Sequence, residues 1–93
     1  MKTIVYDAEN GDAIPDGKAM EYAKNLPPTC VISSSLVIDC VRLLIKQGEY
    51  KNSEVTIMFD QTKLDVNENG RISYWPNGFC DYQDKVLMGL LQV

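Results

Sequence analysis

The order of apolar and polar positions predicts strands that alternate with helices over the first two-thirds of the chain. Short runs rich in Ile, Val and Thr favour extended structure, and the longer segments between them carry apolar residues at helical spacing. In chain order, we expect a strand over 2–6, a helix over 16–25, a strand over 29–33, a helix over 36–47 and a strand over 54–59. This alternation is typical of an α/β fold whose strands pair in parallel through right-handed connections.

Residues with special backbone preferences mark where these helices begin and end. Pro27-Pro28 stops the first helix, because proline has no amide donor and disfavours helical geometry in the residue before it. The hydroxyls of Ser33 to Ser35 stand where they can cap the second helix, and Gly48 stands where a left-handed C-terminal cap is expected. The segment between them is almost continuously apolar, so this helix should be buried on most of its circumference.

Two short alternating runs on either side of Asn69-Gly70 predict an antiparallel hairpin. The runs are Leu64–Val66 and Arg71–Trp75, and each would contribute one strand. The Asn-Gly pair is the usual sequence for the positive φ angles of a type I′ turn. We therefore expect this turn to join the last two strands of the sheet.

The last segment, 81–91, predicts a further helix. Its apolar stripe is formed by Val86, Leu87, Leu90 and Leu91. With this helix, the chain is expected to form a single small α/β domain over residues 1–93. The domain would hold a mixed sheet of about five strands and about three helices, in the order β-α-β-α-β-β-β-α.

Composition and charge exclude several classes of function. The net charge of −4 is spread along the 93 residues and leaves no basic face for nucleic acid. The longest apolar run, Leu36–Ile45, contains Asp39 and Arg42 and is too short to span a bilayer, and the first residues lack a signal-peptide pattern. The three cysteines have no CxxC spacing and should be reduced. We therefore expect a cytoplasmic protein that binds neither nucleic acid nor membrane.

The residues of common catalytic chemistry are missing from this sequence. It has no histidine, so the usual Ser-His and Cys-His arrangements are unavailable. Neither the phosphate-binding pattern GxxxxGK(S/T) nor GxGxxG occurs. Residues 65–72 are similar to the first half of a calcium-binding EF-hand loop, but Pro76 takes the place of the closing glutamate, so a turn is favoured. We expect no enzymatic activity, no cofactor and no metal site.

Two positions could hold a small ligand. Ser33, Ser34 and Ser35 lie at a strand-to-helix junction, where backbone amides of the first helical turn could bind an anion. The other interpretation of these serines is simple capping of the helix. Asp7 follows the first strand and could bind a metal ion or a water molecule, or it could be a solvated residue of a turn.

Aromatic residues gather near the end of the chain. Tyr74, Trp75, Phe79 and Tyr82 fall within nine residues. One interpretation places Trp75 and Phe79 at one end of the core, with the two tyrosines partly exposed. The other is a protein-binding patch, because tryptophan and tyrosine are common anchors at interfaces.

The order of several sequence blocks from Thr29 onward resembles a known family. The blocks are Val31–Ser35, the DVNENGRI sequence of Asp65–Ile72, and the WPNGFCD sequence of Trp75–Asp81. They resemble the C-terminal part of predicted AAA/ABC-type ATPases of the overcoming-lysogenisation-defect (OLD)-like kind. In that family the corresponding blocks are a Thr-His-Ser loop, VDENGRI and WPEGFFD. More weakly, Thr3–Glu9 looks like the acidic strand end of the family's Walker B segment.

The departures from this family concern the catalytic parts. Ser34 stands where the family has the histidine that senses the γ-phosphate, and the chain has neither a Walker A lysine nor a signature loop. Phosphoryl transfer needs a phosphate cradle, a metal ligand and a positioned water together. The resemblance therefore implies a relic of an ATPase lobe without ATPase activity.

Three functions are compatible with the sequence. The first is a non-enzymatic interaction module, of a kind that phages or mobile elements encode, which regulates or inhibits a protein partner such as an OLD-like ATPase. The second is a small nucleotide- or anion-binding protein that uses the helix start at Ser33–Ser35. The third is a homodimeric scaffold protein that associates through an open sheet edge.

Overall fold

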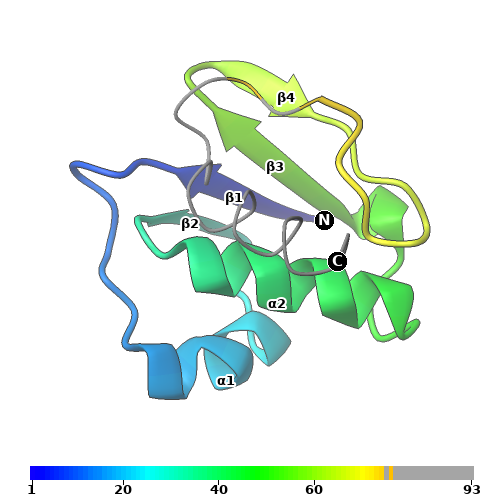
Figure 1. Ribbon diagram of the computed structural model, residues 1–93, viewed down its shortest axis with the longest axis horizontal. Helices are drawn as coiled ribbons and strands as arrows, with labels where there is room; N and C mark the ends of the chain where they lie inside the picture. The colour runs from blue at the N-terminus through cyan, green and yellow to red at the C-terminus, as the bar shows by residue number, and fades with distance from the viewer. Residues whose placement is uncertain (75, 77–93) are drawn as a thin grey trace, which may run out of the picture.

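The computed structural model describes residues 1–74 and 76 of the chain. Its elements, in chain order, are β1 (Lys2–Tyr6), the 3-10 helix η1 (Asp16–Lys18), α1 (Ala19–Lys24), β2 (Thr29–Ile32), α2 (Ser35–Lys46), the 3-10 helix η2 (Asn52–Glu54), β3 (Val55–Phe59) and β4 (Thr62–Leu64) (Figure 1). The strands and helices predicted before residue 60 are confirmed within one residue at each end. The first turn of the helix predicted over 16–25 is the 3-10 helix η1.

The described strands form one mixed sheet in the order β2-β1-β3-β4. β1 pairs in parallel with β2 and with β3, and β3 pairs antiparallel with β4. The α/β class and the mixed sheet are therefore confirmed. The described part of the chain holds four strands and two α-helices, fewer than the about five and about three that the sequence predicted. The helix predicted over 81–91 lies outside the described residues.

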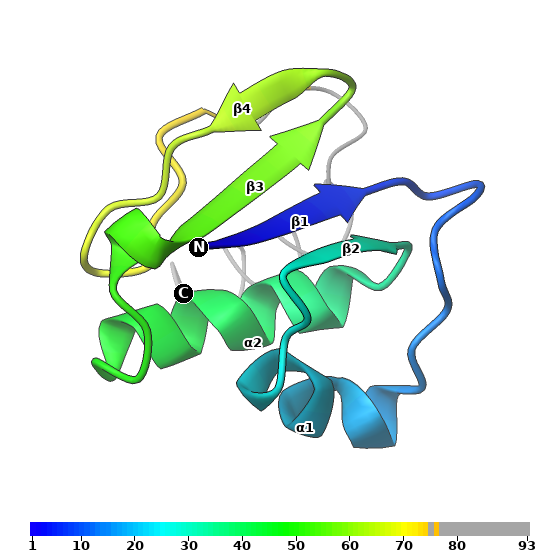
Figure 2. The same cartoon turned by 180° about the vertical axis from the view of Figure 1, so that it is seen from behind.

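One face of the sheet carries the hydrophobic core. Ile4, Ile32 and Ile57 lie on neighbouring strands and are fully buried on this face. They belong to one cluster with the buried face of α2, formed by Val37, Ile38, Val41, Leu44 and Ile45. Figure 2 shows α1 and α2 together on the same side of the strands. The apolar periods of strand and helix thus meet in a single layer between the sheet and the helices.

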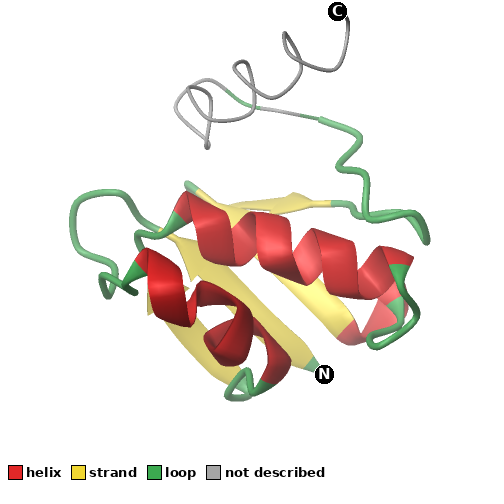
Figure 3. Cartoon of the chain, turned by 60° about the horizontal axis from the view of Figure 1, so that its bottom comes forward, coloured by secondary structure: helices red, strands yellow, loops and turns green. Residues whose placement is uncertain are grey.

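The two parallel connections run in opposite directions across the sheet. From β1 the chain moves to β2 at one edge, and from β2 it passes β1 to reach β3. Both connecting helices nevertheless lie on the same face and contact each other (Figure 3). The two connections therefore have opposite hands, so the expectation that both would be right-handed is wrong. The six-residue α1 packs against α2, on the same side of the sheet. In the described part of the chain, the other face of the sheet therefore has no helix over it.

The tight hairpin of the sheet lies at a position that the sequence did not indicate. β3 and β4 are joined by Asp60 and Gln61, which have φ angles of 50° and 65°. Positive φ at both central residues is the requirement of a type I′ turn. Glycine and asparagine usually fill these positions, and neither occurs here, so the local sequence carried little signal for this turn.

The segment around Asn69-Gly70 forms a different turn from the one predicted. Only Gly70 has a positive φ, of 78°, and the Gly70 N–H donates to the Asn67 carbonyl oxygen at 3.0 Å. Val66 and Ile72 form a single antiparallel bridge in place of the two strands expected around the turn. The Asn67 Oδ1 accepts from the N–H groups of Asn69 and Arg71 at 2.9 and 3.0 Å. This asparagine favours a three-residue loop with glycine in its last position, so the type I′ prediction at this site is wrong.

Candidate functional site

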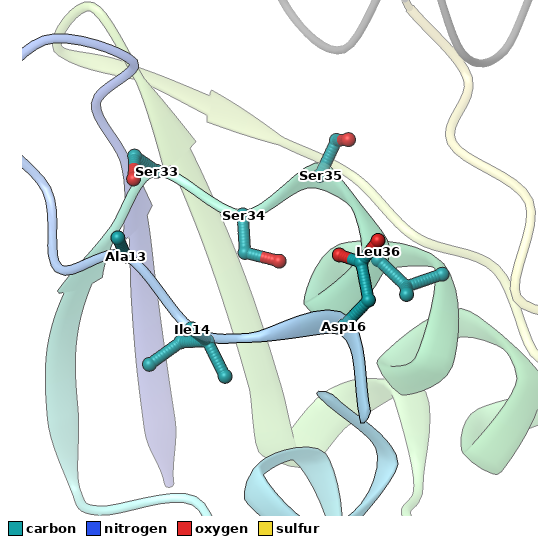
Figure 4. Close-up of a pocket in the computed structure, with 7 residues that line it drawn as sticks. All are labelled: Ala13, Ile14, Asp16, Ser33, Ser34, Ser35 and Leu36. Atoms are coloured by element: carbon teal, nitrogen blue, oxygen red, sulfur yellow. The ribbon is translucent and has the colours of Figure 1, made fainter. Parts of the chain in front are cut away.

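Ser33, Ser34 and Ser35 lie at the junction of β2 and α2, beside a hollow of about 440 Å³ (Figure 4). The Ser34 Oγ accepts from the Val37 N–H at 3.3 Å, which makes Ser34 the N-cap of α2. The Ser33 Oγ donates to the Asp12 carbonyl oxygen at 3.3 Å. Both hydroxyls are therefore used within the fold, and Ser34 has the capping role that the sequence offered as one interpretation.

The charge of this hollow does not favour an anion. Among the described residues, its lining contains one charged side chain, Asp16, and no lysine or arginine. Figure 4 shows the Asp16 carboxylate on the same side of the hollow as the start of α2. A carboxylate near a helix N-terminus complements the positive end of the helix dipole and repels a second negative group. The described part of the hollow thus offers an anion no cationic side chain to offset that repulsion.

Replacing Ser34 with alanine should lower the free energy of unfolding by about 1 kcal/mol, because the Val37 N–H loses its acceptor at the helix start. Urea unfolding followed by circular dichroism would measure this change. Ser53→Ala, at an exposed position in η2, is the matched control and should stay within about 0.5 kcal/mol of the wild type. A ligand role would instead appear as stabilisation of the wild type by ATP, GTP or a cyclic nucleotide, lost in Ser34→Ala.

Asp7 is engaged in the loop that follows β1. Its Oδ1 accepts from the N–H groups of Asn10 and Glu9, both at 3.0 Å. These two bonds stabilise the carboxylate and lower the pKa of Asp7 below its ordinary value. The side chain is partly exposed and bonded to its own loop, so it matches the turn residue that the sequence offered as an alternative to a metal or water ligand. Among the described residues, no group of three acids or cysteines could hold a metal ion.

The structure does not bring the two predicted ligand positions together. Asp7 lines a separate hollow of about 410 Å³ between the ends of β1 and β3, where Tyr6 and Phe59 place their rings 6.0 Å apart. The serines do not line this hollow, and Asp7 does not line theirs. A joint site of Asp7 with Ser33–Ser35 is therefore not formed.

The two cysteines of the described part are free thiols. Cys30 is buried and Cys40 is half-buried on α2. Burial raises the pKa of both thiols, which keeps them protonated at neutral pH and weakens them as nucleophiles. Neither thiol forms a disulfide, which is compatible with the reduced state that the sequence predicted, and Cys80 lies outside the described residues.

The segment 65–73 is fastened to α2 by a contact that the sequence did not indicate. The Arg42 Nε donates to the Gly70 carbonyl oxygen at 2.8 Å, and the Arg42 Nη1 lies 3.2 Å from the Asp39 Oδ1. The Asn52 Nδ2 donates to the Val66 carbonyl oxygen at 3.0 Å from the side of η2. The sequence signal for this contact was Arg42 itself, because a charged side chain inside a largely apolar helix is expected to have a partner.

Tyr74 stands at the end of this anchored segment. It is 60% exposed, the most exposed large aromatic side chain in the described part of the chain. The other members of the predicted aromatic patch, Trp75, Phe79 and Tyr82, lie outside the described residues. The structure thus places one residue of the patch on the surface, next to the segment that Arg42 and Asn52 fasten to the fold.

A family model described as a protein of unknown function (DUF3696) matches residues 50–90. The match begins just before η2 and includes β3, β4, the anchored segment and the four aromatic residues of the predicted patch. Neither a curated protein nor a solved structure shows a significant match to the chain. Because the matched family is uncharacterised, it brings no activity with it, and the relation to OLD-like ATPases stays a prediction. None of the described helices has the length and apolar character needed to cross a membrane.

Proposed function

We propose that this chain is a non-enzymatic interaction module that regulates or inhibits an ATPase-containing protein partner. The observation that carries this proposal is Tyr74, an exposed aromatic residue beside a segment that Arg42 and Asn52 hold against the fold. Exposed tyrosines on rigid supports bind partners well, because little conformational freedom is lost on association. Trp75, Phe79 and Tyr82 would complete the contact surface.

The resemblance to OLD-like ATPases suggests the class of partner. The blocks that resemble this family include Asp65–Ile72, the segment that Arg42 fastens to α2. At the position of the family's phosphate-sensing histidine, Ser34 caps α2. A scaffold that keeps surface blocks of an ATPase lobe without its phosphate-binding residues suits a protein that imitates that lobe at an interface. We propose a phage or another mobile element as its source.

Replacing Tyr74 with alanine should weaken partner binding by about tenfold or more, as expected for an aromatic anchor. The measurement is affinity capture from the native host by the tagged chain, followed by titration of the recovered ATPase. Leu43→Ala, at another exposed apolar side chain on α2, is the control and should leave binding unchanged. Capture of no ATPase by the wild type, or equal binding by Tyr74→Ala, would contradict the proposal.

A further inference from the structure

The face of the sheet turned away from α1 and α2 carries an uncharged set of side chains. In register across β2, β1 and β3, one row consists of threonines and the next of Val, Val and Met. Successive side chains of a strand point to opposite faces, so both rows lie opposite the buried Ile4 and Ile57. These six residues, called the open face below, are Thr29, Thr3, Thr56, Val31, Val5 and Met58.

The open face is where the described strands still expose apolar side chains. On the α2 side, Ile4 and Leu64 are 0% and 2% exposed, so that side of the strands is already filled. On the open face Val31 is 41% exposed, and Val5 and Met58 are partly exposed. Parallel strands are normally covered on both faces, and Figure 3 shows α1 and α2 on one side only. A further layer is therefore expected over the open face.

Acidic side chains at the border of the open face disfavour a second copy of this chain. Glu54 and Asp60 continue the alternation at the two ends of β3, and both are exposed. Asp65 follows β4 and is exposed as well, whereas Lys63 on β4 is basic. A second copy, with its own net charge of −4, would bring like charges to this border. The occupant should therefore present an uncharged apolar surface.

The open face is also too small for a separate partner. Three strands about 4.8 Å apart, each of about five residues rising about 3.3 Å, give a footprint of about 240 Å². A stable complex between separate proteins buries about 800 Å² per partner. A segment of the same chain needs less, because its tether keeps it at an effective concentration in roughly the millimolar range. The footprint therefore favours an occupant from within the chain.

The segment 81–91, which follows the described residues, has the surface that this face requires. At the helical spacing that its sequence predicts, one side is free of charge and carries Val86, Leu87, Leu90 and Leu91. Of its charged residues, Asp81 and Lys85 fall on the opposite side, and Asp84 falls at the margin of the apolar stripe. The stripe can therefore meet the open face while these charges stay in water.

The chain is long enough to bring this segment over the open face. The described part leads to the β4 side of the sheet, where the Ser73 N–H donates to the Asp65 carbonyl oxygen at 3.2 Å. Residues 77–80 then span up to about 13 Å, more than two strand spacings of about 4.8 Å. A helix over 81–91 would be about 16 Å long, as long as the five-residue strands β1 and β3. The segment can therefore start at the β4 edge and lie along β3 and β1.

The family match joins this segment to the strands in one unit. Residues 50–90 match a single family model, which takes in β3, β4 and most of segment 81–91. Parts that recur together in one family unit of this size are expected to share a core.

We propose that residues 81–91 of this chain form a helix whose apolar stripe covers the open face. Both apolar surfaces then leave water together, which supplies the driving force. A helix of this length is marginal by itself in water and part of the packing energy forms it, so the docked form should be favoured by only about fivefold. This inference does not rest on the proposed ATPase partner, because the stripe does not include Tyr74, Trp75, Phe79 or Tyr82.

Nuclear magnetic resonance of the full chain with labelled methyl groups tests this packing. Nuclear Overhauser effects are expected between the methyls of Leu87 and Leu90 and those of Val5 and Met58. Leu90→Asp should weaken docking by about tenfold, because a carboxylate would be buried without a partner. These effects should then fall by more than half. Met88→Asp, an equal change outside the stripe, is the matched control and should keep them.

Val31 and Leu43 provide a second matched pair, within the described part of the chain. The two side chains are 41% and 42% exposed, one on the open face and the other on α2. Val31→Asp should weaken docking by about threefold, because its carboxylate would lose water at the edge of the covered surface. Leu43→Asp should leave the same Overhauser effects unchanged. Circular dichroism of each variant would verify that the fold is kept.

Three results would overturn the proposal. The first is a wild type in which the methyls of Leu87 and Leu90 contact Leu43, or no described residue, in place of Val5 and Met58. The second is a contact seen only between differently labelled chains in a mixed sample, which would identify a second copy as the occupant. The third is an equal response of docking to Leu90→Asp and Met88→Asp, since the stripe would then play no part.

Discussion

Replacing Gly70 with alanine is expected to lower the free energy of unfolding by about 3 kcal/mol or more. Gly70 has a φ of 78°, and an added Cβ would lie 2.2 Å from the Arg42 carbonyl oxygen and 2.9 Å from its carbonyl carbon. The atoms it would meet belong to the backbone of α2, so they cannot rotate away. The anchored segment would have to lift from α2, which breaks the bond from Arg42 and exposes the buried Val66 and Ile72.

Two other glycines separate the cost of a positive φ angle from the cost of steric overlap with α2. Gly48 has a φ of 84° but nothing within 4 Å of an added Cβ, so Gly48→Ala should cost about 1 kcal/mol from backbone conformation alone. Gly17 has neither a positive φ nor a neighbour within 4 Å, and Gly17→Ala should stay within about 0.5 kcal/mol. Urea unfolding of the three variants measures the series. Equal losses for Gly70→Ala and Gly48→Ala would show that the segment does not lie against α2.

The second large effect is expected at the centre of the sheet. Ile57→Ala should lower the free energy of unfolding by about 3 kcal/mol, because it opens a cavity that rigid neighbours cannot fill. Ile57 is fully buried on β3, and its partners on the adjacent strands, Ile4 and Leu64, are 0% and 2% exposed. Unfolding in urea, at a chain concentration well below that of any self-association, provides the value.

The neighbouring residue is the matched control for this substitution. Met58 lies next to Ile57 on the same strand but on the opposite face of the sheet, where its side chain is partly exposed. Met58→Ala should therefore cost about 1 kcal/mol or less. A larger loss for Met58→Ala than for Ile57→Ala would mean that β3 is shifted by one residue, because such a slip exchanges the two faces of a strand.

The elements before residue 60 could be predicted because their signals are local. Pro27-Pro28 ends one helix and Ser34 caps the next, and both effects act within a few residues of chain. The alternation in β1 and β3 likewise depends on neighbours in the same strand. Asp60-Gln61 was missed because the closing of a tight turn around unfavourable residues depends on the pairing of β3 with β4, which is a tertiary property.

The local features of the candidate site could also be predicted, whereas its long-range contacts could not. The capping role of Ser34 and the turn role of Asp7 were among the interpretations that the sequence offered, because each needs only backbone amides two or three residues away. That these two residues line separate hollows could not be predicted, since it depends on how the ends of the strands are arranged. The bond from Arg42 to Gly70 spans 28 residues, and nothing near either residue specifies the other.

The sequence by itself determined the α/β class, the bounds of the early elements and the alternation that gives each strand two faces. Only the tertiary structure decided that β1 lies between β2 and β3, and that α1 and α2 share one side of the sheet. The physical reason is that the two faces of a strand are set by its own residues, whereas the alignment of strands depends on contacts between segments far apart in the chain. Three separate Thr-x-Val or Thr-x-Met patterns become one surface when the strands align in register.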